Sequence, residues 1–160
     1  MTTASPKTRI QYLRDARNVY AANGADGLRY ATPGSVGLDL RACIDADEAE
    51  IPAGGRLPIP TGIAVEPLTP GIAGFVYSRS GLGAVQGLTV AQGVGVIDPD
   101  YRGEIKVILV NLSNEPFELK PGERIAQLVV AQFTRIEWES VSELSETERG
   151  AGGFGSTGRK

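Results

Sequence analysis

Residues 105–133 read IKVILVNLSNEPFELKPGERIAQLVVAQF, two aliphatic runs separated by turn signals. In residues 105–110 apolar side chains fall on both faces of an extended segment, which predicts a buried strand. Residues 124–133 are similarly rich in aliphatic residues and predict another strand. Between the runs, Pro121-Gly122 suits the two central positions of a type II turn. Short strands joined by tight turns are therefore the expected structure of this region.

The same alternation continues along the rest of the chain. Further strands are predicted at residues 9–13 and 74–78, and a helix of one or two turns after Ser80. Turn signals recur from residue 32 onward, at Pro33-Gly34, Pro52 to Gly55, Pro67 to Gly71 and Asp98 to Asp100. This spacing predicts an all-β sandwich or closed barrel of the jelly-roll kind, and it leaves residues 15–30 unassigned.

The composition limits the chemistry that the chain can perform. Its 160 residues fit one domain, and 41% of them are hydrophobic but only 6% aromatic. The absence of histidine from the sequence excludes a Ser-His-Asp or Cys-His nucleophilic site and a histidine-bound zinc. The single cysteine, Cys43, excludes an internal disulfide and is predicted to be a small buried side chain. Base chemistry must then come from carboxylates, which can also hold magnesium.

Charge and hydropathy argue against two classes of partner. The net charge is -3 and the pI is about 5.1, unlike the basic field of a nucleic-acid-binding protein. Glycine, proline and charge interrupt every apolar run before the roughly 18 residues of a membrane span. Residues 1–14 also lack the hydrophobic core of a signal peptide. A cytoplasmic protein without nucleic-acid or membrane partners is expected.

Several short motifs carry candidate functional side chains, and each has a structural alternative. Arg79-Ser80-Gly81, before the short helix, suits a phosphate or is an ordinary exit from a strand. Asp39 interrupts an apolar run, so it is paired, near a metal, or exposed on a half-buried strand. Asp98 begins a segment that also suits a type I turn. Arg124 and Gln127 would face opposite sides of a flat strand, so both reach one ligand only if the strand bends. Otherwise they contact different neighbours, as a surface arginine and a half-buried glutamine.

The order of the motifs says more than any one of them. Five segments follow one another: SVGLDL at 35–40, SRSGL at 78–82, GVGVIDPDYRGE at 93–104, GERIAQL at 122–128 and RGAGGFGSTG at 149–158. In this order, from about Thr32 to Gly158, they resemble the motifs of the trimeric dUTPases, enzymes that hydrolyse dUTP to dUMP and pyrophosphate. The resemblance implies an all-β jelly roll or distorted β-barrel, a homotrimer with shared active sites, and Mg2+ as cofactor.

Composition and the resemblance together divide the chain into four parts. Residues 1–31 are expected to form a lead-in with one strand, residues 32–136 the barrel core, and residues 137–148 an acidic linker. Residues 149–160 are expected to form a flexible glycine-rich arm that orders only on the ligand. Composition alone would also fit a disordered end.

The resemblance assigns catalytic roles residue by residue. Asp98 matches the aspartate that deprotonates the water attacking the α-phosphorus, and Gln127 matches a glutamine that places this water and the α-phosphate. Asp39 matches an aspartate that contacts Mg2+ through water, while the substrate phosphates hold most of the ion.

The resemblance also assigns substrate contacts. Tyr101 matches the tyrosine that packs on deoxyribose and excludes a 2′-hydroxyl, and Phe154 matches the aromatic ring over uracil. A β-hairpin, here residues 88–97, reads uracil largely through backbone groups; its Gln92 stands where many bacterial relatives carry asparagine. The implied substrate-binding residues are Arg79, Ser80, Gly81, Gln92, Gly95, Val96, Ile97, Tyr101, Lys106, Arg124, Arg149, Phe154, Gly155, Ser156 and Thr157.

Two other functions share parts of this pattern. A relative that binds nucleotide only as a regulator would need no catalytic side chains, yet all the expected ones are present. A dCTP deaminase shares the fold but needs further polar side chains around the cytosine amino group, and the complete hairpin and arm motifs argue for dUTP instead.

Overall fold

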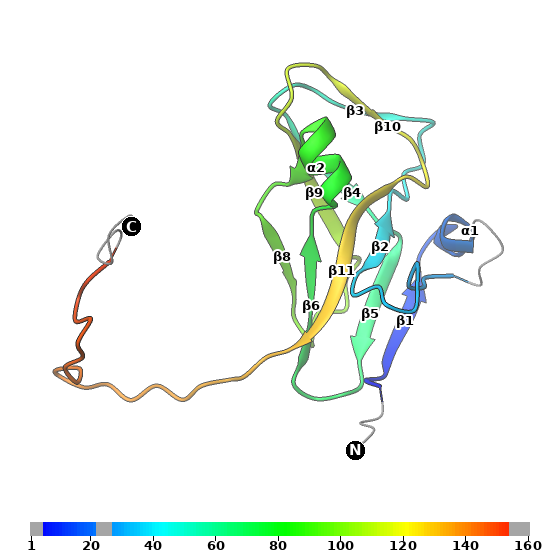
Figure 1. Cartoon of the computed structure of the whole chain (residues 1–160). Helices are drawn as coiled ribbons and strands as arrows, with labels where there is room; N and C mark the ends of the chain where they lie inside the picture. Colours follow the sequence, from blue (N-terminus) through cyan, green and yellow to red (C-terminus); the bar gives the residue numbers. More distant parts are fainter. Residues whose placement is uncertain (1–4, 22–26, 154–160) are drawn as a thin grey trace.

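The computed structural model describes residues 5–21 and 27–153 (Figure 1). Within them the secondary structure is mostly β, which confirms the predicted all-β class. The two helices are short, α1 (Ala16–Ala21) and α2 (Ser80–Gln86). The strands are β1 (Thr8–Tyr12), β2 (Leu38–Arg41), β3 (Ala49–Ile51), β4 (Arg56–Pro60), β5 (Ile63–Pro67), β6 (Ile72–Tyr77), β7 (Leu88–Val90), β8 (Val94–Ile97), β9 (Lys106–Asn111), β10 (Phe117–Leu119) and β11 (Arg124–Gln132).

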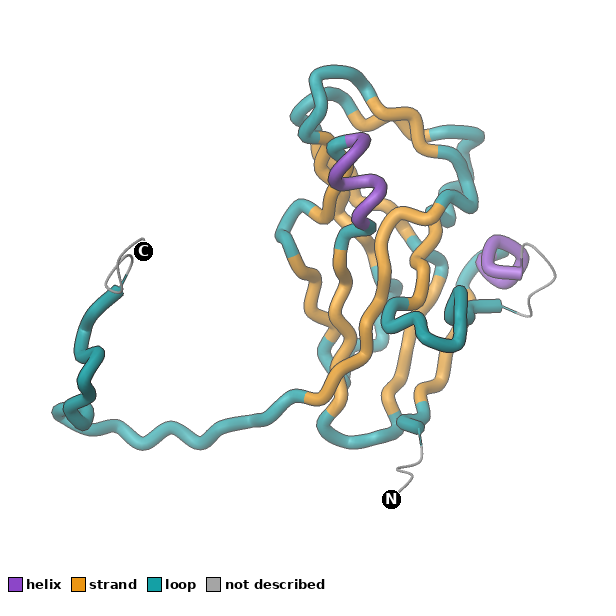
Figure 2. Tube along the Cα trace, viewed as in Figure 1, coloured by secondary structure: helices purple, strands orange, loops and turns teal. Residues whose placement is uncertain are grey.

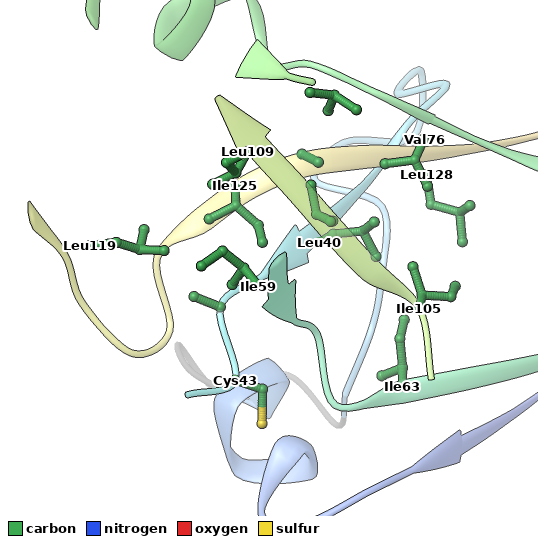
Figure 3. Packing of buried hydrophobic residues seen from close by; sticks show 14 of the residues in the cluster. Leu40, Cys43, Ile59, Ile63, Val76, Ile105, Leu109, Leu119, Ile125 and Leu128 are labelled. Carbon is green, nitrogen blue, oxygen red and sulfur yellow. The ribbon is translucent and has the colours of Figure 1, made fainter. Parts of the chain in front are cut away.

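Two larger sheets enclose the core. One has the order β2-β11-β6-β8 and the other β4-β9-β7, while β1-β5 and β10-β3 form smaller pairs. All of these strand pairs are antiparallel. Leu40 and Leu128 from the first sheet and Ile59 and Leu109 from the second are buried in one aliphatic cluster (Figure 3). The predicted jelly-roll architecture is confirmed, with the mainly aliphatic core that the low aromatic content requires.

The strands predicted from the sequence lie within two residues of their expected bounds, and the short helix after Ser80 is α2. One detail of burial was wrong. In β9 the inward side chains are buried, but Ile108 is 37% exposed and Lys106 is exposed as well, because in the single chain this part of the outer face has no covering layer. Apolar residues on both faces of a strand therefore do not require that both be buried within one chain.

The turn at Pro121-Gly122 has the backbone that its sequence predicts. Gly122 has φ of +80°, which position i+2 of a type II turn requires and which costs glycine little. Its N–H donates to the Ala42 carbonyl at 2.8 Å, so the turn is tied to the end of β2. This turn sets where β11 begins and hence where Arg124 lies.

Helix α1 lies within residues 15–30, for which the sequence predicted no structure, and it packs on the body through Ala16 and Tyr20. Both side chains are buried, and the Tyr20 hydroxyl accepts a hydrogen bond from the Arg41 N–H at 3.1 Å. Burial raises the pKa of Tyr20 to about 12. Cys43 is buried nearby, as predicted. The lead-in is thus a packed part of the domain.

Beyond β11 the chain leaves the body. Residues 133–153 run away from the sheets as a largely extended segment (Figures 1 and 2). Four of its large apolar side chains are exposed: Ile136, Trp138, Val141 and Leu144. Among the described residues, no helix has the length and hydropathy to span a membrane.

Candidate active site

Asp39 joins two arginines that come from distant parts of the sequence. It lies in β2, Arg79 lies between β6 and α2, and Arg124 begins β11. The Arg79 Nε donates to Asp39 Oδ1 at 3.0 Å, and the Arg124 Nη1 donates to Asp39 Oδ2 at 3.2 Å. Of the alternatives that the sequence left open for Asp39, the structure shows the paired one. The carboxylate holds two guanidinium groups on one surface, an arrangement suited to phosphate oxygens.

A β-bulge explains how Arg124 and Gln127 reach the same place. Opposite β2, the register of β11 shifts between Arg124 and Ala126, and Gln127 then pairs directly with Asp39. Directly opposed residues share a face of the sheet, so the extra residue places Gln127 on the side of Asp39. The Gln127 Nε2 donates to the Ser78 carbonyl at 3.1 Å. The bend that a shared ligand would require is present.

Ser80 and Gly81 form the exposed first turn of α2, next to Arg79. No side chain caps this turn, and an added Cβ at Gly81 would meet nothing within 4 Å. Free N–H groups at the start of a helix favour anionic oxygens. Together with Arg79 and Arg124, these two residues form one cationic surface, which we call the arginine edge.

A second cluster surrounds a cavity of about 250 Å³ at the end of β8. Of the predicted site residues, Gln92, Gly95, Val96, Ile97, Asp98, Tyr101 and Lys106 line it, and Glu104 joins them. The Tyr101 N–H donates to the Asp98 carbonyl at 3.1 Å, which closes the predicted turn. The Tyr101 hydroxyl donates to the Glu104 carbonyl at 3.0 Å. We call this cluster the carboxylate cavity.

The prediction that residues 88–97 form a β-hairpin was wrong, because the two strands of this segment do not pair with each other. The Gly93 N–H donates to the Val90 carbonyl at 3.0 Å and closes a turn, but β7 pairs with β9 whereas β8 pairs with β6. The segment therefore crosses from one sheet to the other. Among the described residues β8 is the last strand of its sheet, so one side of its backbone is not paired with another strand, and Gly95, Val96 and Ile97 line the carboxylate cavity.

The two clusters do not meet within one chain. β2 and β8 are the opposite edges of the sheet ordered β2-β11-β6-β8 (Figure 1). Three strand spacings of about 4.8 Å place Asp39, in β2, about 14 Å from β8. Arg79 follows Tyr77, which pairs with Val94 at the start of β8, whereas Asp98 follows Ile97 at the other end of this strand. The structure thus brings Asp39, Arg79, Arg124 and Gln127 together, and Asp98 with Tyr101, but it separates the first set from the second.

Comparison with known proteins agrees with the motif order. A sequence model of the dUTPase family matches residues 24–158. The deoxyuridine 5'-triphosphate nucleotidohydrolase of Polynucleobacter asymbioticus is 50% identical over 130 residues, which cover 81% of this chain and 87% of that protein. The chain belongs to the dUTPase family.

Solved dUTPase structures share its fold at low sequence identity. A variant of the dUTPase of Staphylococcus bacteriophage 80alpha, solved with dUpNHpp, superposes with a TM-score of 0.78 at 23% identity, covering 95% of this chain and 98% of that one. A variant of the dUTPase from phage phi11 of S. aureus, described with a structural Mg(II) ion, gives a TM-score of 0.72 at 18% identity, covering 88% and 99%. These similarities support the jelly-roll topology.

Of the dUTPase arm motif, the structure describes the first part only. Arg149 is exposed on the extended tail, where its Nε donates to the Gly152 carbonyl at 3.0 Å. This turn lies far from both clusters in the chain (Figure 1). Phe154, Gly155, Ser156 and Thr157 lie outside the described residues.

Asp39, which pairs with the two arginines of the arginine edge, suits a magnesium ion that is held mainly by the substrate. Both oxygens of Asp39 accept from arginines, and the described residues contain no group of three or more acidic or cysteine side chains placed to hold a metal. Mg2+ commonly keeps several waters and binds through one or two carboxylates plus substrate phosphates. A single carboxylate beside a phosphate surface fits the predicted contact through water.

Sequence reasoning gave no role to Glu104, although it ends the third dUTPase motif. Its side chain is 12% exposed and lines the carboxylate cavity. The signal was a carboxylate placed directly before the apolar run that begins at Ile105, since such a group needs partners when it is buried. Those partners come from sequence positions more than 40 residues away.

Proposed function

We propose that this chain hydrolyses dUTP to dUMP and pyrophosphate in the cytoplasm, as a homotrimer whose active sites form between chains. Such an activity keeps uracil out of DNA and supplies dUMP for thymidylate synthesis. The observation that carries the proposal is the separation of the family motifs into two partial sites of complementary chemistry. The arginine edge suits a triphosphate, and the carboxylate cavity offers a base and a pocket for a nucleoside.

The positions of the charged side chains explain why a second chain is needed. A nucleoside triphosphate is strongly anionic, whereas the protein carries a net charge of -3. Arg79 and Arg124 concentrate positive charge in one cluster, whereas Asp98 follows the opposite end of β8 from the end that pairs beside Arg79. Within one chain Asp98 and these arginines belong to separate clusters, and we infer that a second chain brings the two together. In a closed ring, the cavity edge of one copy can face the arginine edge of the next.

The extended tail gives independent support for association. Trp138 and Leu144 are 88% and 87% exposed, and Ile136 and Val141 are also exposed. Large apolar side chains in such a run favour burial against another surface. A tail that reaches a neighbouring copy would also carry Arg149 and the rest of the arm motif toward that copy's site.

The proposed chemistry is an in-line attack of water on the α-phosphorus. Asp98 accepts the proton of the attacking water, and Gln127 helps to place that water against the phosphate. Arg79, the first turn of α2 and Arg124 stabilise charge on the phosphate oxygens. Mg2+ bound to the phosphates would neutralise part of their charge, with Asp39 contacting it through water.

The carboxylate cavity is proposed to select the nucleoside. The Tyr101 ring packs over Gly103, where an added Cβ would come within 2.6 Å of the Tyr101 Cζ. This fixed ring is proposed to lie against deoxyribose and to exclude a 2′-hydroxyl. Backbone groups of residues 92–97 read uracil, with Gln92 beside Gly95, and Lys106 adds a cation at the rim.

A substrate comparison tests the proposal. The full chain is incubated with Mg2+ and either dUTP or dCTP, and pyrophosphate and ammonia are assayed. We expect pyrophosphate from dUTP and no ammonia from dCTP. Ammonia from dCTP would identify a deaminase, and tight dUTP binding without pyrophosphate would identify a nucleotide-binding regulator; either outcome contradicts the proposal.

A further inference from the structure

The loop of residues 98–104 carries Asp98 and Tyr101, and its end is held by one partly buried side chain, that of Glu104. Glu104 accepts a hydrogen bond from the Gly62 N–H at 2.8 Å and also pairs with Arg14, both through Oε1. Its backbone carbonyl accepts the hydrogen bond from the Tyr101 hydroxyl. The position of Tyr101 therefore depends on where Glu104 is held.

Arg14 reaches Glu104 because the chain turns sharply after β1. Among the described residues, Arg14 is the non-glycine residue with a positive φ, +51°. Arginine rarely adopts this left-handed conformation, so the surrounding contacts must hold it there. The Leu13 N–H donates to the Gly62 carbonyl at 2.7 Å and fixes the residue before the turn.

Gly62 in turn is fixed by close packing. It has φ of +70°, and an added Cβ would come within 2.7 Å of the Cys43 Sγ. The lead-in thus meets the barrel at a rigid point, with Gly62 hydrogen-bonded to Leu13 through its carbonyl and to Glu104 through its N–H. Buried polar groups that depend on one another in this way resist displacement more than isolated contacts do.

A second connection between lead-in and loop is weaker. Glu66 pairs with Arg9 of β1 at 3.0 Å and with Arg102 of the loop at 3.6 Å. The Arg9 and Arg102 side chains are 70% and 52% exposed, so water and salt screen both pairs. The pair of Arg14 with Glu104 is therefore the main polar tie.

We propose that Arg14 is a positioning residue for the dUTPase reaction: through Glu104 it holds the loop that carries Asp98 and Tyr101. Arg14 lies outside residues 24–158, which the family model matches, so the lead-in adds this support to the family motifs. The kinetic part of this inference rests on the proposed function. The rigidity of the loop does not, and it is measured separately.

Loss of the guanidinium would leave the carboxylate of Glu104 with the Gly62 N–H as its remaining polar partner among those described. The loop end would relax, and Tyr101 with it. Displacing a reacting group by about 1 Å can cost about 100-fold in rate. We expect Arg14→Ala to lower kcat by about tenfold to 100-fold and to lower the preference for dUTP over UTP several-fold, with a smaller change in KM.

The experiment compares Arg14→Ala with Arg14→Lys and with Arg56→Ala. Lysine keeps a positive charge near Glu104 and should restore most of kcat and of the dUTP preference. Arg56 is an exposed arginine of β4, far from the loop, and its removal should leave both unchanged. The second readout is limited trypsin digestion, since Arg102 is an exposed cleavage site within the loop. Cleavage after Arg102 should be several-fold faster in Arg14→Ala, while cleavage after Arg135 in the tail should not change.

The two readouts separate the inference from the proposed function. If folded Arg14→Ala keeps the kcat, the dUTP preference and the trypsin pattern of the unmodified protein, Arg14 does not position the loop. If Arg14→Ala does not fold, Arg14→Lys and Glu104→Gln decide in the same assays, and unchanged kinetics in Glu104→Gln overturn the inference. If the unmodified protein does not hydrolyse dUTP, the proposed function fails, and digestion after Arg102 alone decides whether Arg14 holds the loop.

Discussion

The arginine edge and the carboxylate cavity differ in what holds them and in what they can bind. In the arginine edge, Arg79 and Arg124 share one carboxylate, Asp39, and the three residues lie in or next to paired strands of this sheet. At the β8 edge, Asp98 and Tyr101 lie on a loop beside a cavity of about 250 Å³. The arginine edge offers cations for phosphates, and the carboxylate cavity offers a base and space for a ligand. A substrate that needs both must be bound between copies of the chain.

The difference also explains where rigidity has to be added. A β-bulge within the sheet places the arginine edge, whereas the loop of residues 98–104 relies on a polar tie to the lead-in. Substitutions in the carboxylate cavity should therefore affect kcat and nucleoside preference, and substitutions in the arginine edge should affect the binding of phosphates.

The largest effect is expected from Asp98→Asn. The amide keeps the size of the side chain but cannot accept the proton of water, so kcat should fall by about 10²–10⁴-fold. Binding of a non-hydrolysable dUTP analogue, measured by calorimetry, should change little. Asp100→Asn in the same exposed turn is the control and should keep near-normal kcat. Near-normal kcat in Asp98→Asn would remove Asp98 from the role of base.

Removal of residues 149–160 should have the next largest effect. The arm is expected to close over the substrate and exclude water, so its loss should lower turnover by about 100-fold. The melting temperature should hardly change, because residues 149–151 are exposed. Phe154→Ala should be a milder version. Turnover of the truncated protein at close to the full-length rate would show that the arm has no catalytic role.

Tyr101→Ala should change selectivity more than rate. Without the ring over Gly103, space opens for a 2′-hydroxyl, and the ratio of kcat/KM for dUTP to that for UTP should fall about tenfold. Tyr30→Ala, which removes an exposed ring outside both clusters, is the matched control. An unchanged ratio in Tyr101→Ala would place the sugar selection elsewhere.

The smallest effect on activity is expected from Tyr20→Phe, which acts on stability beside the arginine edge. The change removes the acceptor of the Arg41 N–H and should cost about 1 kcal/mol in the free energy of unfolding at pH 7. Burial raises the pKa of Tyr20 from 10.0 to about 12, so the folded state favours the neutral phenol. The contribution of Tyr20 to the free energy of unfolding is complete below about pH 10 and is lost as the pH rises through about 12. Urea unfolding measured between about pH 8 and pH 11 should therefore show that the free energy of unfolding falls more steeply with pH in the unmodified protein than in Tyr20→Phe. Equal pH dependence in the two proteins would contradict this assignment.

The sequence predicted local structure well and long-range pairing poorly. Alternation and turn residues were enough to predict β6, β9, β11 and the turn at Gly122, because each depends on neighbours in the chain. The pairing of β7 with β9 rather than β8 depends on the sheet order, which no local pattern contains. The same limit hid the tie between Arg14 and Glu104, which are 90 residues apart.

For the site, the motifs predicted which residues matter but not where each would lie. The spacing of Arg124 and Gln127 predicted that β11 bends if both side chains reach one ligand, and the bulge supplies that bend. Asp39 and Asp98 were assigned to one site, yet the order β2-β11-β6-β8 places them at opposite edges. That separation follows from the topology of the whole sheet, which the sequence pattern alone does not determine.

A mixing experiment decides whether the active site is shared between chains. Asp98→Asn lacks the base but keeps the arginine edge, and Arg79→Ala lacks part of the arginine edge but keeps the base. The two inactive variants are unfolded together in equal amounts and refolded, and dUTP hydrolysis is measured. If each site takes Asp98 from one chain and Arg79 from another, random assembly makes about one site in four intact, so about a quarter of the unmodified activity should return. If one chain supplied both residues, no site would be intact, and a mixture of folded, assembled chains without activity would contradict the shared site.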